Sequence, residues 1–465
     1  MTNRYVYAFS RRVAFCAAVI LVTVVGCGGG GGGTGSGGHG ATGGSGATGG
    51  SSCPTSSATG TLAIEISGTP SGDGAVIVGD VATGTEVTTS SDVTVTAGPQ
   101  AVTAFIATVP GTLVRTAYSP VVDNPTPCVH AGEVTTVHVT YSIIDTSGVV
   151  WTGLANGPTT ASLLGFDPAT VTATNNTLAV VVADTHGADG FTFDVFGDLW
   201  VTGGTTADPP VARYPAAMLA TNGVKTPDFT LDSPSFGSSI PGPKVLTFDR
   251  AGGLWVSVVA AGKVVKFEET QLVPGGSTTA SVEQTGLMGP MGVAFDSAGN
   301  MWVASNDSDT VVRINAAHLT SNGSGADFAI TAMTSGVVNS VLRFPIGLAF
   351  DATGNLWVNY DGTIAELPAS VLGGTGAITV TPPVQLVTDV GALPEGIAFD
   401  EQGGLWFSYT AGKFARFAAS QLVATTGTAI PGTIISSADI GAGGDAGWFA
   451  FYPAPAFTPL AHAFN

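Results

Sequence analysis

Residues 290–303, PMGVAFDSAGNMWV, decide the fold of this chain. The run from Pro290 to Phe295 is apolar, Asp296 and Gly299 are turn-forming residues, and Trp302 lies in a second apolar run. An aspartate side chain can cap a tight turn, and glycine adopts the positive φ that such a turn requires. The stretch therefore predicts a β-hairpin, with bulky aromatic side chains that fill the space beside it.

The same hairpin pattern recurs along most of the chain. Each copy has a Phe-Asp pair followed six residues later by a tryptophan, and the copies begin at Phe193, Phe248, Phe295, Phe350 and Phe399. Successive aspartates are 55, 47, 55 and 49 residues apart. Repeats of this length, built from short strands, are typical of β-propeller blades. The sequence therefore predicts an all-β protein with a propeller as its main domain.

A sixth copy is divided between two distant parts of the chain. Trp151 and the segment after it resemble the later part of a repeat, but no Phe-Asp strand precedes them. The segment Gly447–Tyr452 supplies a matching strand near the C-terminus. Pairing the two would close the ring and leave no open sheet edge. We therefore expect a six-bladed propeller over residues 147–465, since five or seven blades would leave a fragment unpaired.

The repeated motif Pro-x-Gly-[Val/Leu/Ile]-Ala-Phe-Asp resembles the repeats of NHL and SMP-30/gluconolactonase-like propellers. The resemblance implies that residue x of each repeat lies at one mouth of the central channel. The aligned residues are Asp189, Lys244, Met291, Ile346, Glu395 and Gly447.

The resemblance also raises the question of a metal site. In gluconolactonase-like enzymes, acidic and amide residues at these positions hold a divalent cation, and here Asp189 and Glu395 are of that type. Two carboxylates fall short of the six to eight oxygens that calcium takes, and Lys244 would oppose a cation. We expect no cofactor, and a calcium-like cation at Asp189 and Glu395 remains the alternative. Catalytic residues stay unassigned.

A smaller domain precedes the repeats. Residues 60–144 alternate apolar and polar side chains in short runs separated by turn residues, which predicts a small antiparallel β-sandwich. The region resembles carboxypeptidase-regulatory-like and Ig-like modules, which usually act as spacers. Cys53 and Cys128 form an even pair in a chain that we expect to be exported, so we predict a disulfide between them.

The N-terminus predicts export and lipid attachment. Residues 1–26 have early arginines and an apolar run, and the segment ending at Gly26-Cys27 resembles the lipobox of bacterial lipoproteins, with Cys27 as the lipidated residue. A signal peptide without lipidation, or a short anchor helix, is the alternative. Residues 27–59 are rich in glycine and predict a flexible tether. We therefore expect an outer-membrane or cell-surface lipoprotein.

Composition limits the classes of partner. The chain carries 14 basic and 33 acidic residues, which gives a net charge of −19. Such a surface has no electrostatic attraction for nucleic acid. We expect a monomer that contacts the membrane only through its lipid and binds a protein, peptide or glycan. The alternative function is a gluconolactonase-like hydrolase or lyase with a metal at the channel mouth.

Overall fold

The computed structural model describes residues 53–455. The undescribed positions within that range are 73, 82, 110, 112–113, 155–162, 167–177, 184–188, 204–209, 238–241, 334–341, 388–393, 410–412, 424–425, 429–432 and 437–445. The predicted signal peptide, most of the predicted tether and Cys27 lie outside the described residues.

The described residues are almost entirely β-structure, as the sequence predicts. Their only α-helix is α1 (Ala369–Leu372), a single turn. No helix in the described part of the chain has the length and apolar character needed to cross a membrane.

Residues 59–143 form three sheets. The first has the strand order β4-β1-β10-β8-β7 and consists of β1 (Thr59–Ser67), β4 (Ser91–Thr96), β7 (Ala107–Val109), β8 (Thr116–Val122) and β10 (Val134–Ile143). The second has the order β3-β2-β6, with β2 (Ala75–Val78), β3 (Thr85–Val87) and β6 (Val102–Phe105). A short third sheet pairs β5 (Gly98–Pro99) with β9 (Cys128–Val129).

The first two sheets share one apolar core. Every second side chain of β1, namely Leu62, Ile64 and Ile66, is buried in a cluster that also holds residues of β2 and β10. The expectation of a purely antiparallel arrangement is wrong at one pair, because β1 runs parallel to β10. Alternation of apolar residues indicates which face of a strand is buried but not the direction of its neighbour.

The predicted disulfide is confirmed. Cys53 and Cys128 are bonded, with their Cα atoms 5.6 Å apart. The bond fastens the first described residue of the chain to β9, beside the segment that enters β10.

The remaining strands form a β-propeller. Within the described residues, six sheets of four or five strands follow one another along the chain. The first contains β11 (Val150–Leu154), β12 (Leu163–Phe166), β13 (Leu178–Ala183), β17 (Gly223–Val224) and β38 (Ala446–Phe451). The second contains β14 (Phe191–Phe193), β15 (Leu199–Thr202), β16 (Val211–Tyr214) and β18 (Phe229–Leu231). The third contains β19 (Pro243–Phe248), β20 (Leu254–Val258), β21 (Lys263–Phe267), β22 (Val282–Thr285) and β26 (Gly323–Ser324).

The other three sheets follow the same plan. The fourth contains β23 (Pro290–Phe295), β24 (Met301–Ser305), β25 (Thr310–Ile314), β27 (Phe328–Met333) and β31 (Gly376–Val380). The fifth contains β28 (Pro345–Phe350), β29 (Leu356–Tyr360), β30 (Thr363–Leu367), β32 (Gln385–Val387) and β36 (Thr426–Thr428). The sixth contains β33 (Pro394–Phe399), β34 (Leu405–Tyr409), β35 (Lys413–Phe417) and β37 (Thr433–Ser436).

Short helical turns complete the described elements. Four 3₁₀ turns follow the third strand of a sheet, at the position that α1 takes in the fifth: η1 (Ala216–Ala220), η3 (Glu269–Gln271), η5 (Ala316–His318) and η6 (Ala419–Gln421). Two others are η2 (Pro234–Phe236) and η4 (Asn306–Ser308).

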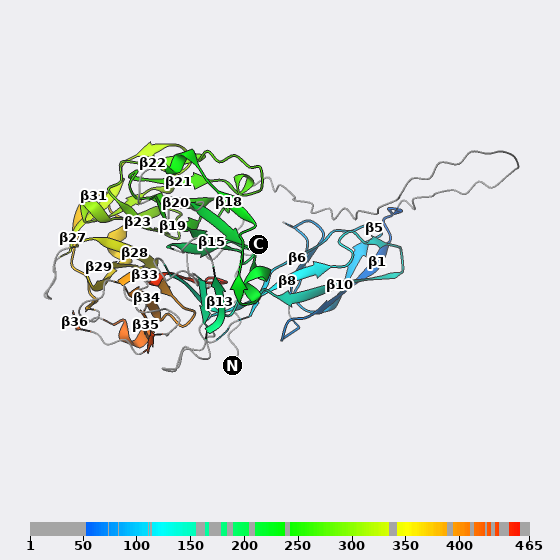
Figure 1. Cartoon of the computed structure of the whole chain (residues 1–465). Coiled ribbons are helices and arrows are strands. Elements are labelled where there is room, and N and C mark those ends of the chain that lie inside the picture. The colour runs from blue at the N-terminus through cyan, green and yellow to red at the C-terminus, as the bar shows by residue number, and fades with distance from the viewer. Residues whose placement is uncertain are drawn as a thin grey trace, which may run out of the picture. The chain divides into compact units, whose positions relative to one another are not determined.

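The first strand of each repeat lies at the centre of the ring. Figure 1 shows the sheets arranged around a common centre, with β19, β23, β28 and β33 closest to it. Each inner strand contacts the next in the order β14, β19, β23, β28, β33 and β38, and β38 contacts β14. The strand β38 also pairs with β11, where Ala450 lies opposite Trp151. The two ends of the repeat region therefore meet in one sheet.

Tryptophan and phenylalanine join each sheet to its neighbour. The tryptophan of one sheet contacts the inner-strand phenylalanine of the next, with ring centroids 5.9–6.3 Å apart. These pairs are Trp151–Phe193, Trp200–Phe248, Trp255–Phe295, Trp302–Phe350, Trp357–Phe399 and Trp406–Phe451. The contacts pass once around the ring, so the repeated aromatics bury the surfaces between sheets.

Candidate functional site

The six predicted mouth residues lie at equivalent places. Lys244, Met291, Ile346, Glu395 and Gly447 are the second residues of their inner strands, and Asp189 lies two residues before β14. Because neighbouring inner strands are in contact, these positions share one end of the channel.

Two of these residues neutralise each other. The Nζ of Lys244 donates to Oδ1 of Asp189 at 2.9 Å, and both side chains are mostly buried. Across the ring, the Glu395 backbone carbonyl accepts a hydrogen bond of 2.6 Å from Nδ2 of Asn359. No group of three or more His, Cys, Asp or Glu residues suited to a metal occurs among the described residues. A cation at Asp189 would have to displace the lysine, so this end of the channel is a poor fit for the metal site that the resemblance suggested.

A large aromatic residue occupies the same end. Trp448 follows Gly447 and is 7% exposed, in a buried apolar cluster that includes Val245. Met291 and Ile346 pack against this cluster. Met291 and Ile346 are therefore held by apolar packing and offer no metal ligand at this end of the channel. The signal for this packing was present in the sequence, because Trp448 stands where four other repeats have glycine.

Those glycines bring the inner strands close together. A Cβ atom at Gly190 would lie 2.1 Å from the Lys244 carbonyl oxygen, one at Gly292 would lie 2.3 Å from that of Ile346, and one at Gly347 would lie 2.6 Å from that of Glu395. Real Cβ atoms essentially never approach so closely, so glycine at these positions sets the width of the ring.

Buried polar side chains complete this layer of the ring. The Thr202 hydroxyl accepts from the Gly190 N–H at 2.9 Å and donates to the Lys244 carbonyl at 2.9 Å. Ser408 accepts from the Gly396 N–H at 2.9 Å. Neither residue is among the predicted site residues, although a small polar residue two positions after a tryptophan recurs in the sequence. Their bonds satisfy backbone groups at irregularities of the inner strands, which makes their role structural.

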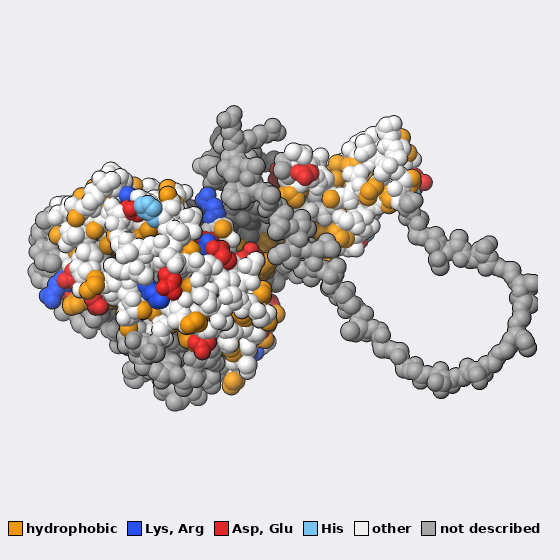
Figure 2. Space-filling view, turned by 90° about the horizontal axis from the view of Figure 1, so that it is seen from above, with side chains coloured by type: hydrophobic (Ala, Val, Ile, Leu, Met, Phe, Trp, Pro, Cys, Tyr) orange, Lys and Arg blue, Asp and Glu red, His pale blue; other side chains and the backbone are white. Residues whose placement is uncertain are grey.

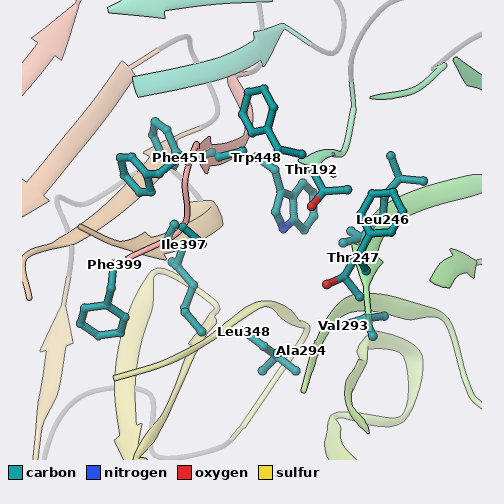
Figure 3. Close-up of a pocket in the computed structure, with 18 of the residues that line it drawn as sticks. Thr192, Leu246, Thr247, Val293, Ala294, Leu348, Ile397, Phe399, Trp448 and Phe451 are labelled. Atoms are coloured by element: carbon teal, nitrogen blue, oxygen red, sulfur yellow. The ribbon is translucent and has the colours of Figure 1, made fainter. Parts of the chain in front are cut away.

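A cavity lies further along the channel, toward the carboxyl ends of the inner strands. It has a volume of about 220 Å³ and is lined by all six inner strands and by the segment up to Pro455. Most of the lining is apolar, and none of the six predicted mouth residues belongs to it. Figure 3 shows Leu246, Val293, Leu348 and Ile397 around the space, with the indole of Trp448 pointing into it.

One position of the repeat explains why this space is open. The residue before the inner-strand phenylalanine is small in every repeat: Thr192, Thr247, Ala294, Ala349, Ala398 and Ala450. All six line the cavity. The cavity is therefore a consequence of the repeat itself, which no single copy of the motif reveals.

Asp194 is the one acidic residue in the described lining of this cavity. Burial raises its pKa to about 6, against the hydrogen bond from the Trp200 indole, which lowers it. Its Oδ1 accepts the N–H groups of Phe196 and Asp198, and its Oδ2 accepts Nε1–H of Trp200 at 2.9 Å. The carboxylate is thus held in the hairpin turn, which confirms the structural role expected for the repeated aspartates.

No protein-family model matches this chain, and no curated protein matches it. Solved structures do show similarity. Virginiamycin B lyase from Staphylococcus aureus is 18% identical with a TM-score of 0.34, and the match covers 50% of this chain and 68% of that one. A chain of the nidogen/laminin complex is 13% identical with a TM-score of 0.43, covering 65% and 98% of the two chains. The WD40 β-propeller domain of Doa1 is 13% identical with a TM-score of 0.39, covering 63% and 80%. Similarities at this level of identity and TM-score give no information about the activity of this chain.

Proposed function

We propose that this chain is an exported, lipid-anchored binding protein. In this proposal residues 1–26 are a signal peptide, Cys27 carries the lipid, and residues 27–59 are the tether. Residues 60–144 are a small β-sandwich that acts as a spacer, and residues 147–465 are a six-bladed propeller that takes the ligand.

The two ends of the channel differ in chemistry, and this difference favours binding over catalysis. The end with charged residues is occupied by the Lys244–Asp189 pair and the cluster around Trp448. The open space is mostly apolar, and its one described acidic residue, Asp194, is held in a hairpin turn. A metal-dependent hydrolase needs polar groups that converge on a reacting atom, whereas an apolar cavity suits binding.

The surface is consistent with a partner other than nucleic acid. Figure 2 shows single acidic and basic side chains scattered over the face in view, with no broad basic area among the described atoms. The net charge of −19 opposes binding to a phosphate backbone.

Metal binding provides the test of this choice. The purified mature protein should bind no stoichiometric Ca²⁺, Mn²⁺ or Zn²⁺ in equilibrium dialysis, because Lys244 holds Asp189. Asp189→Ala and Glu395→Ala should leave this result unchanged. Stoichiometric metal that is lost in both variants, together with lactone hydrolysis, would overturn the proposal in favour of a gluconolactonase-like enzyme.

The anchor is tested separately. Mass spectrometry of the mature N-terminus from a bacterial membrane fraction should find Cys27 as the first residue, carrying a diacylglyceryl group. An N-terminus at another residue, or an unmodified Cys27, would contradict the lipid anchor while leaving the binding function of the propeller untouched.

A further inference from the structure

We propose that the channel cavity is a binding site for a small aromatic molecule of one or two rings that carries a hydrogen-bonding group, such as a phenol or an indole. The inference rests on the proposed binding function and names the chemical class of the ligand. The size of the cavity, the apolar side chains that line it and one hydroxyl group in the lining support this inference.

The volume fits a ligand of this size. The cavity measures about 220 Å³. An apolar protein cavity of about 150 Å³ stays dry and binds benzene, so this cavity has room for one ring with a substituent or for two fused rings. Branched aliphatic and aromatic side chains surround it, including Leu246, Val293, Ile397 and Trp448. These groups favour apolar rings by burial and by edge or face contact with the indole.

A polar group of the ligand has a defined place to bind. Thr247 is 7% exposed and lines the cavity, and its hydroxyl has no hydrogen-bond partner among the described residues. Thr192, on the neighbouring strand β14, also lines it. Figure 3 shows both hydroxyl oxygens directed toward the space between the inner strands. The Thr247 hydroxyl is therefore accessible from the cavity, and a ligand with a donor or acceptor can hydrogen-bond to it in place of water.

Phenol and toluene are suitable probes, because they share a ring and differ in the hydroxyl group. Isothermal titration of the mature protein should show saturable binding of both. Thr247→Val keeps the shape of the side chain and removes its hydroxyl. It should weaken phenol binding about three- to tenfold and leave toluene binding unchanged.

A substitution that fills the cavity provides the second test of this inference. Ala349→Leu should abolish binding of both probes, because the larger side chain enters the space. Ala260→Leu, at an exposed hairpin residue, is the matched control and should bind both probes as the parent does. A melting transition like that of the parent would show that each variant is folded.

Two results would overturn this inference: no saturable binding of either probe, or full binding by Ala349→Leu. Unchanged phenol binding by Thr247→Val would overturn the role of the hydroxyl. None of these results affects the metal-dialysis test, so failure of the cavity inference is distinguishable from failure of the proposed function.

Discussion

The repeated aspartate binds several donors at once, and its ionisation depends on which donors are present. In Asp351, Oδ1 accepts the N–H groups of Thr353 and Asn355, while Oδ2 accepts Trp357 Nε1–H and Asn355 Nδ2–H, both at 3.0 Å. Burial opposes ionisation of Asp351, but the hydrogen bonds from the Trp357 indole, from the hydroxyl and N–H of Thr353 and from the Asn355 N–H outweigh it and lower the pKa.

Asp194 has the same turn but lacks the asparagine. The residue four positions later is Asp198, whose Oδ1 accepts the Ala216 N–H at 2.9 Å, just as Oδ1 of Asn355 accepts the Ala369 N–H. Burial raises the pKa of Asp194 to about 6 against the hydrogen bond from Trp200, and the like charge of Asp198 adds to the increase. An aspartate at position 198 also has no N–H to donate to Asp194.

Asp198→Asn should therefore stabilise the protein at neutral pH by about 1–2 kcal/mol, since its Nδ2 would donate to Asp194. A raised carboxyl pKa means that the parent loses stability as the pH rises from 3.8 toward about 6. The advantage of the variant in urea unfolding should grow over that range and persist at pH 7–8.

The reciprocal variant is the control for this prediction. Asn355→Asp should raise the pKa of Asp351 and lower stability at neutral pH. Equal stability of Asp198→Asn and the parent at every pH would show that the donor at this position does not control the carboxylate.

At the scale of the elements, the sheets are joined by short strands that the repeat pattern did not predict. The segments β17, β26, β31 and β36 each pair in parallel with the last strand of the preceding sheet, for example Gly223 opposite Val182. They contain two to five residues, several of them glycine, so hydrophobic alternation gives no signal for them.

The inner strands depend on glycine for their spacing. Gly292→Ala places a Cβ atom 2.3 Å from the backbone oxygen of Ile346, which cannot move without shifting β28. We expect a loss of about 2–3 kcal/mol in the free energy of unfolding, measured by urea titration.

Gly373→Ala is the matched control for Gly292→Ala. Gly373 follows α1, has a φ of −81° and would have nothing within 4 Å of a new Cβ atom. The free energy of unfolding of the Gly373→Ala variant should stay within about 0.5 kcal/mol of that of the parent. Similar effects of the two substitutions would mean that the inner strands are not packed through glycine.

At the scale of the whole molecule, closure of the ring depends on β38. This strand supplies the inner edge for β11, and Phe451 contacts Trp406 of the sixth sheet. Removal of residues 447–465 would expose an edge of β11 and strip the inner strand from the first sheet.

We expect that truncated protein to aggregate, or to lose its cooperative thermal transition in calorimetry. Removal of residues 456–465 alone keeps β38 and should keep the transition. If the protein without residues 447–465 melts as the parent does, the ring is not held closed by the C-terminal strand.

The sequence by itself determined the class of fold and the repeated hairpin, because local chemistry decides both. Phe-Asp, the turn glycine and the tryptophan act within about ten residues of one another, so one copy is sufficient to predict the hairpin and five copies to predict the propeller. The Cys53–Cys128 bond was also predictable, from the count of cysteines.

Only the tertiary structure decided where a ligand could bind. The aligned mouth positions were identified from the repeat, but their chemistry depends on neighbours from other repeats: Lys244 on Asp189, and Met291 on the cluster that contains Trp448. The cavity depends on how much space six small side chains leave when the strands meet. That quantity follows from the diameter of the ring, and no single stretch of sequence encodes it.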